Sequence, residues 1–146
     1  MPAERAYVPN MPLMSAEQLL QTNIPNKRTE LVRGVLIVRE LHGARHGMVV
    51  ANLCGEIGTH VHAHQLGTAL VGTGFILARN PDTVRAPDVA FVRKGKTAHP
   101  APVGYPEFAP DLAVEVRSPN DRPGETLSNV GDSVLSAFAC PLAAIL

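Results

Sequence analysis

The sequence contains no tryptophan and only two cysteines, Cys54 and Cys140, in its 146 residues. These two cysteines lie far apart, so the sequence has no CxxC pair, no zinc-knuckle pattern and no disulfide framework. Small secreted proteins commonly depend on several disulfides. We therefore expect a protein of the reducing cytoplasm.

An excess of charge is also missing, because 13 basic residues balance 13 acidic ones. Contact with nucleic acid would therefore need a local basic patch or a metal ion. The one long apolar run, residues 133–146, is shorter than the roughly 20 residues that cross a bilayer, and no signal peptide is recognisable. We expect no membrane insertion.

A chain of this length buries roughly two thirds of its unfolded surface, which suffices for one apolar core. Residues 1–14 contain three prolines and no periodicity, so they read as an extended arm. Residues 15–132 form the predicted domain. Residues 133–146 are an atypical apolar tail without clear alternation, and we expect this tail not to complete a sheet.

Two helices are indicated by local patterns. Ser15 and Gln18 fit a capping box, which predicts a short helix over residues 16–21. Between residues 43 and 64, apolar side chains recur every four residues, which is typical of an amphipathic helix. This stripe consists of Val49, Leu53, Ile57 and Val61.

Strands are indicated by β-branched and apolar stretches between glycines and prolines. Residues 29–40 predict a hairpin that turns at Arg33-Gly34. Further strands are expected at residues 69–71, 74–78, 84–92 and 112–116, a surface loop at 94–110, and a weaker helix at 121–132.

Two acidic residues interrupt predicted strands: Asp88 in RAPDVAFV and Glu115 in PDLAVEVRSP. An ionised carboxylate on a half-buried strand is costly unless it is paired or bound to a metal. Strand alternation places Glu115 and Arg117 on one face. Two converging carboxylates would hold Mg²⁺ or Mn²⁺, whereas the plainer alternative is a salt bridge from Arg117 to either acid.

The segments ELVRG, the helix that His46 begins, APDVAFV and DLAVEVRSPND together resemble the Uma-two family, which belongs to the PD-(D/E)xK nuclease superfamily. The resemblance covers about residues 15–121. It implies an α/β, restriction-endonuclease-like fold with a mixed β-sheet flanked by helices. It also implies Mg²⁺-dependent (or Mn²⁺-dependent) hydrolysis of DNA phosphodiester bonds.

The resemblance assigns roles to five residues. Asp88 and Glu115 match the two acids of the family motif and would bind the metal. Glu30 matches the acid of the opening hairpin, and His46 matches the histidine that begins the helix. Arg117 occupies the place of the superfamily's lysine and would contact phosphate.

Sequence pattern alone leaves plainer roles open for two of these residues. Glu30 fits an exposed hairpin charge, and His46, four residues after His42, fits a solvent-facing residue at a helix start.

This sequence departs from the family pattern in three places. Arginine is permanently protonated and cannot act as a base, so Arg117 does not replace the lysine fully. Relatives often carry a lysine on the following helix, where this sequence has Asn129. Family members also continue into further strands, so we expect a C-terminally shortened or aberrant relative.

Three histidines, His60, His62 and His64, form a second candidate cluster. On a strand they would share one face and suggest a zinc or copper site. The apolar stripe favours a helix, on which His60 and His64 face the same way and His62 does not. No third ligand with a known spacing follows, so surface histidines are the expectation.

Two functions from different classes are consistent with these observations. The first is a metal-dependent endonuclease, which would act on DNA and would need two sites, hence a homodimer, to cut both strands. The second is a nuclease-like binding or assembly module that has lost turnover. The missing lysine and the abnormal tail are the features that separate the two.

Overall fold

The computed structural model describes residues 12–98 and 101–117, together with the backbone of residues 134–139. The chain divides into two compact units. The first combines Met1–Leu41, Gly74–Ala86 and Pro102–Ala109, and the second combines His42–Thr73, Pro87–Ala101 and Pro110–Leu146. In the described residues each unit contains one helix and one four-stranded antiparallel sheet, so the predicted α/β class is confirmed.

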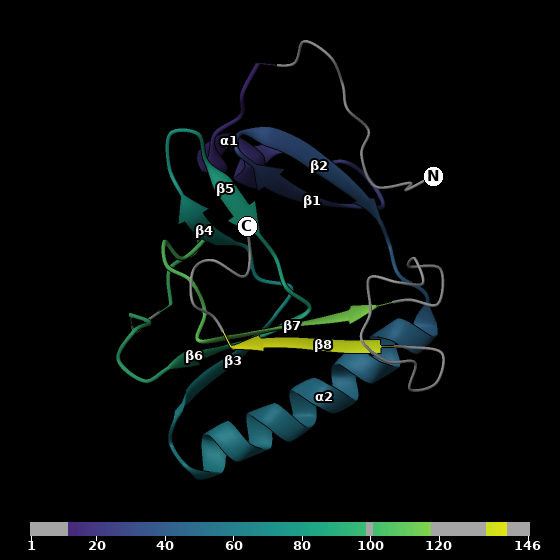
Figure 1. Ribbon diagram of the computed structural model, residues 1–146, viewed down its shortest axis with the longest axis vertical. Coiled ribbons are helices and arrows are strands. Elements are labelled where there is room, and N and C mark those ends of the chain that lie inside the picture. Colours follow the sequence, from purple (N-terminus) through teal and green to yellow (C-terminus); the bar gives the residue numbers. More distant parts are fainter. Residues whose placement is uncertain (1–11, 99–100, 118–133, 140–146) are drawn as a thin grey trace. The chain divides into compact units, whose positions relative to one another are not determined.

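Unit 1 contains the predicted short helix and hairpin (Figure 1). Its elements are α1 (Ala16–Gln21), β1 (Lys27–Val32), β2 (Val35–Glu40), β4 (Phe75–Ala78) and β5 (Thr83–Arg85). The strand order is β2-β1-β5-β4. The Ser15–Gln18 capping box is present, which confirms the predicted start of α1.

The hairpin turn of unit 1 lies at Arg33 and Gly34, as predicted. Both residues have positive φ, 50° and 76°, which suits a tight turn between twisted antiparallel strands. Beneath the hairpin, side chains from α1 pack against the sheet. This core consists of Ala16, Leu19, Leu31, Ile76 and Val84.

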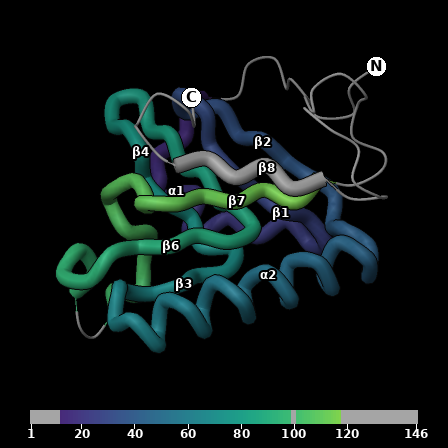
Figure 2. The backbone as a smooth tube through the Cα atoms, turned by 60° about the horizontal axis from the view of Figure 1, so that its bottom comes forward, coloured from purple at the N-terminus to yellow at the C-terminus, as the bar shows by residue number. Residues whose placement is uncertain are grey.

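Unit 2 contains α2 (Ala44–Ala63), β3 (Gly67–Val71), β6 (Val89–Arg93), β7 (Leu112–Arg117) and β8 (Val134–Ala139). The strand order is β3-β6-β7-β8. Helix α2 contacts β3, β6 and β7, and Figure 2 shows it running beside them.

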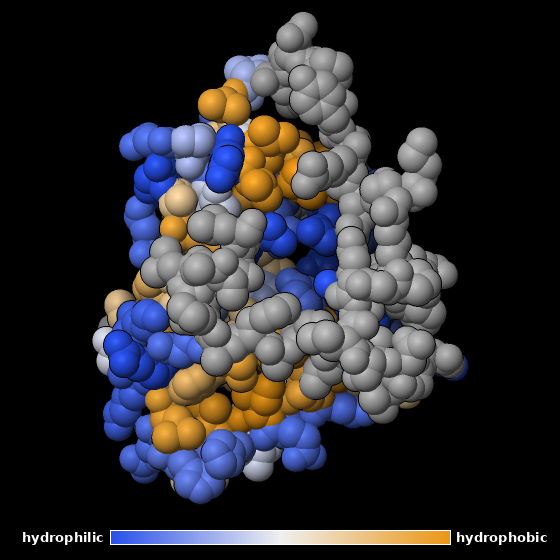
Figure 3. Space-filling view, in the orientation of Figure 1, coloured by the Kyte–Doolittle hydropathy of each residue, from blue (hydrophilic) through white to orange (hydrophobic). Residues whose placement is uncertain are grey.

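The predicted apolar stripe of α2 is confirmed. Val61 is buried, and Val49, Leu53 and Ile57 are half-buried. Figure 3 has the same orientation as Figure 1. In its lower part, where Figure 1 draws α2, hydrophobic side chains lie next to a hydrophilic outer face. None of the helices in the described part of the chain is both long and apolar enough to cross a membrane.

Two sequence-based expectations are corrected by the strand pairing. Residues 84–92 form two strands, because β5 pairs with β1 and β4 whereas β6 pairs with β3 and β7. The sequence predicts a tail that does not complete a sheet, but β8 pairs with β7 along six residues. Figure 1 draws these two strands side by side. The predicted helix at 121–132 lies outside the described residues.

Asp82 is a buried residue of unit 1 that connects α1 to the strands. Its carboxylate accepts hydrogen bonds from the backbone N–H groups of Ala16, at 2.8 Å, and Asn80, at 3.2 Å. The guanidinium of Arg79 lies 3.0 Å away. The hydrogen bond from Ala16 is the largest of the effects that hold the pKa of Asp82 below its ordinary value.

We therefore expect unit 1 to lose stability in acid, as the Asp82 carboxylate becomes protonated. A carboxyl group whose pKa is lowered by folding stabilises the fold above its unfolded pKa, about 3.9, and this contribution is lost as the pH falls through the folded value. Asp82→Asn should cost about 1–2 kcal/mol at pH 7 and flatten the dependence on pH below 4. Urea unfolding between pH 7 and pH 3 measures both effects, and identical pH profiles for the two proteins would contradict this role.

Candidate functional site

A buried histidine and a buried aspartate meet at the start of β6. His46 lies in the first turn of α2, and Asp88 immediately precedes β6. The relative exposure of these residues is 8% and 6%. His46 Nε2 lies 2.8 Å from the carbonyl oxygen of Val116 and 3.3 Å from Asp88 Oδ2. His46 therefore does not face solvent, which corrects the plainer of its two sequence interpretations.

The backbone of Val116 in β7 holds both of these side chains. Its N–H donates to Asp88 Oδ2 at 2.7 Å, and its carbonyl oxygen is the 2.8 Å neighbour of His46 Nε2. A neutral imidazole that donates from Nε2 carries its lone pair on Nδ1. The strand backbone thus fixes the orientation of the aspartate and favours one tautomer of the histidine.

A second histidine joins this pair. The His42 ring stacks on the His46 ring, with centroids 3.7 Å apart and planes inclined by 14°. His42, His46 and Asp88 each offer one ligand atom, and these three atoms lie within 4.8 Å of one another. In the part of the chain that the structure describes, these three side chains form a group that is compact enough to hold a metal ion.

Glu115 and Arg117 lie on β7, next to β6. The strand register pairs Val89 with Val114, so continuing it by one residue places Asp88 opposite Glu115. Strand alternation puts Arg117 on the same face as Glu115. The two predicted acids therefore belong to neighbouring strand positions. That they share a cation remains a prediction.

Glu30 lies on β1 of unit 1 and is only 4% exposed, so it is not the exposed hairpin charge that the pattern allowed. Its Oε1 accepts a hydrogen bond from the N–H of Ala86 at 2.7 Å. Arg39 Nε lies 3.1 Å from Oε2, and Arg85 Nε lies 3.5 Å from Oε1. The two arginines surround Glu30 with positive charge.

The second candidate cluster, His60, His62 and His64, lies at the end of α2, in the helix that the apolar stripe predicted. His60 and His62 belong to its last turn and His64 is its C-cap. The rings of His60 and His64 are tilted against each other with centroids 4.3 Å apart. In the described residues, the histidines that lie close enough to an acidic side chain to share a metal ion are His42 and His46, not His60, His62 or His64.

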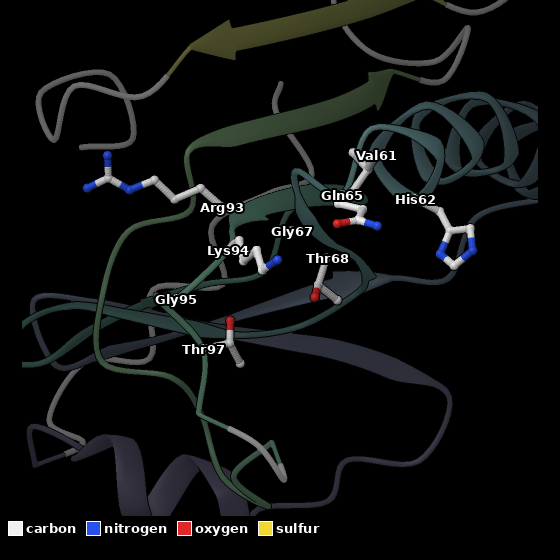
Figure 4. A pocket seen from close by; sticks show the side chains of 9 residues that line it. All are labelled: Val61, His62, Gln65, Gly67, Thr68, Arg93, Lys94, Gly95 and Thr97. Atoms are coloured by element: carbon white, nitrogen blue, oxygen red, sulfur yellow. The ribbon is translucent and has the colours of Figure 1, made fainter.

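A hollow of about 330 Å³ lies between the end of α2 and the loop after β6 (Figure 4). Its lining contains Gln65, Thr68, Lys94 and Thr97 but no carboxylate. The hydroxyl oxygen of Thr97 is buried and has no hydrogen-bond partner in the described part of the chain. Figure 4 shows the Arg93 guanidinium turned away from the other lining side chains. Lys94 therefore supplies the positive charge of this hollow, which is chemically suited to an anionic group.

A family model that carries the description "Putative restriction endonuclease", Uma2, matches residues 16–128. This range is most of the chain and includes Glu30, His46, Asp88, Glu115 and Arg117. The chain belongs to the Uma2 family, the Uma-two family that its motifs resemble, and its fold is of the restriction-endonuclease-like α/β type. No curated protein matches the sequence.

Proposed function

We propose that this protein is a metal-dependent endonuclease that hydrolyses phosphodiester bonds of DNA. The observation that carries the proposal is the buried carboxylate of Asp88, held by the N–H of Val116, the residue that follows Glu115 on β7, in a member of a restriction-endonuclease family. A buried charge at this place is costly unless a counter-charge compensates it.

The donor set suits a divalent cation, because carboxylate oxygens are the preferred protein ligands of Mg²⁺ and Mn²⁺. Asp88 and Glu115 would hold the ion. When bound, such an ion supplies charge for the scissile phosphate and lowers the pKa of a water ligand. His46 positions Asp88, and Arg117 contacts a phosphate oxygen with its planar fork. Glu30, which the family motif includes, supports the hairpin of unit 1.

The hollow beside Lys94 supports DNA as the substrate. The net charge of the chain is zero, so binding to a phosphate backbone needs a local cation. Lys94 is such a cation and lies in a hollow whose lining carries no carboxylate. An ammonium group and neighbouring hydroxyl groups suit a backbone phosphate without recognising sequence.

Supercoiled plasmid tests the activity. We expect slow conversion to the nicked form with Mg²⁺ or Mn²⁺, none with EDTA, and heat release on titration with Mn²⁺. Metal binding without any nicking would favour the second candidate function, a nuclease-like binding or assembly module without turnover. The observation behind this alternative is that arginine stands where the superfamily has lysine.

The product distribution tests whether the protein acts as a homodimer, which we also propose. Two sites in one dimer cut both strands in a single encounter, whereas a monomer leaves nicked circles. Linear plasmid that accumulates together with nicked plasmid, and a dimeric mass in light scattering, are the expected results.

Arg117 is expected to affect the rate of cleavage more than metal affinity. Arg117→Ala removes a positioned charge, which typically costs about a hundredfold in rate. Arg117→Lys keeps the charge but loses the bidentate fork, so its rate should lie between those of the alanine variant and the native protein. Initial nicking rates and Mn²⁺ titrations of the three proteins separate the two effects. A lysine variant that is faster than the native protein would contradict phosphate contact and indicate a role in proton transfer.

A further inference from the structure

We propose that His42, His46 and Asp88 form a three-ligand site that selects a divalent transition metal, such as Zn²⁺ or Co²⁺, over Mg²⁺. This inference rests on the proposed function in that Asp88 serves the same centre. It adds His42 and His46 as ligands, so that His46 binds the ion as well as positioning Asp88, and it names the class of metal. The carrying observation is the spacing of the three ligand atoms, all within 4.8 Å of one another.

The donor types decide the class of metal. Two imidazole nitrogens and one carboxylate oxygen suit zinc, cobalt and nickel, whereas Mg²⁺ demands an oxygen shell and keeps most of its water. Three protein ligands that leave a fourth position open are also the usual arrangement of catalytic zinc. An oxygen-only pair of Asp88 and Glu115 would show a smaller preference, because it lacks the nitrogen ligands.

His46 faces Asp88 with one of its ring nitrogens. Its Nε2 lies 3.3 Å from Asp88 Oδ2 and 2.8 Å from the Val116 carbonyl oxygen. An ion shared with Asp88 would therefore bind at Nε2, in place of the hydrogen bond to the Val116 carbonyl, because Nδ1 lies on the far side of the ring. The N–H of the same residue holds Asp88, so one peptide segment of β7 orders two of the three ligands.

His42 completes the set but must turn to do so. The lone pair of an imidazole lies in the ring plane, so two rings stacked 3.7 Å apart do not both point at one ion. His42 is exposed and precedes the N-cap of α2, whereas His46 is buried. Rotation of the His42 ring off its neighbour is therefore the movement that closes the site.

Titration of the chelator-treated, full-length protein with Co²⁺, Zn²⁺ and Mg²⁺ tests this site. Calorimetry gives the affinities, and the visible absorption of Co²⁺ reports nitrogen ligands. We expect Co²⁺ and Zn²⁺ to bind at least about tenfold more tightly than Mg²⁺. His42→Ala should weaken Co²⁺ binding by about tenfold or more, because even loss of an outer-shell partner commonly costs that much.

His60→Ala is the matched control, since His60 is also exposed and its ring lies beside that of a histidine four residues away, with centroids 4.3 Å apart. The control should bind Co²⁺ as the native protein does. Equal Co²⁺ affinity of His42→Ala and native protein, or tighter binding of Mg²⁺ than of Zn²⁺, would overturn the proposal. Circular dichroism shows whether each variant is folded.

Plasmid nicking on the same samples keeps the two proposals distinguishable. Co²⁺ binding that depends on His42, without nicking in any metal, would support this site and contradict the endonuclease. Nicking in Mg²⁺ together with Co²⁺ binding that does not depend on His42 would support the endonuclease and contradict this site.

Discussion

Asp88→Asn should lower the nicking rate by at least about a hundredfold while the protein remains folded. The asparagine amide oxygen can still accept the hydrogen bond from the Val116 N–H that Asp88 Oδ2 accepts at 2.7 Å. The amide has no charge, however, and is a weak partner for a divalent cation. Metal affinity and cleavage should therefore fall together, and the unfolding transition should change little.

Asp111→Asn is the matched control for this prediction. Asp111 also precedes a strand of unit 2 and accepts a backbone hydrogen bond, from Arg93 at 2.9 Å. It is more exposed than Asp88 and pairs with Lys96 at 3.5 Å. If both variants lose activity equally, or neither does, Asp88 is not a metal ligand. Asp88→Ala should in addition destabilise the fold by about 1–3 kcal/mol, because the buried Val116 N–H loses its acceptor.

The sequence predicted those parts of the fold that local chemistry determines. Ser15 and Gln18 lie three residues apart in the chain, so their capping box is visible without any tertiary information. The stripe from Val49 to Val61 likewise depends only on the period of a helix. Pairing between distant segments was not visible. Thr83–Arg85 and Val89–Arg93 are both short and lie close together in the sequence, and only their partners assign them to different sheets.

The residues of the candidate site were likewise predictable only where a local pattern marks them. An acid inside an apolar strand is unusual enough to single out Asp88 and Glu115. For His42 the sequence indicates only that it lies four residues before His46, because its approach to Asp88 depends on where α2 packs in unit 2. Asp82 was missed as well, since an aspartate after Asn80-Pro81 reads as an ordinary turn residue although it binds the start of α1.

Glu30→Gln should lower the free energy of unfolding by about 2–3 kcal/mol. Breaking a buried ion pair on one side typically costs about 3–5 kcal/mol, and here the arginines retain some contact with water. The side chains of Arg39 and Arg85 are 32% and 27% exposed, against 6% for Glu30. The glutamine can still accept the N–H of Ala86, so the loss comes from the missing charge. Urea denaturation measures it.

Glu40→Gln provides the control, because Glu40 forms another carboxylate pair of the same hairpin, with Lys27. The Glu40 side chain is 78% exposed, and an exposed pair contributes less than about 1 kcal/mol. The glutamine at residue 40 should therefore leave the unfolding curve nearly unchanged. If Glu30→Gln were equally mild in urea but abolished nicking, Glu30 would belong to the chemistry of cleavage. We expect instead that Glu30→Gln lowers the stability and leaves nicking in place, because a carboxylate enclosed by two arginines has its charge already compensated within unit 1.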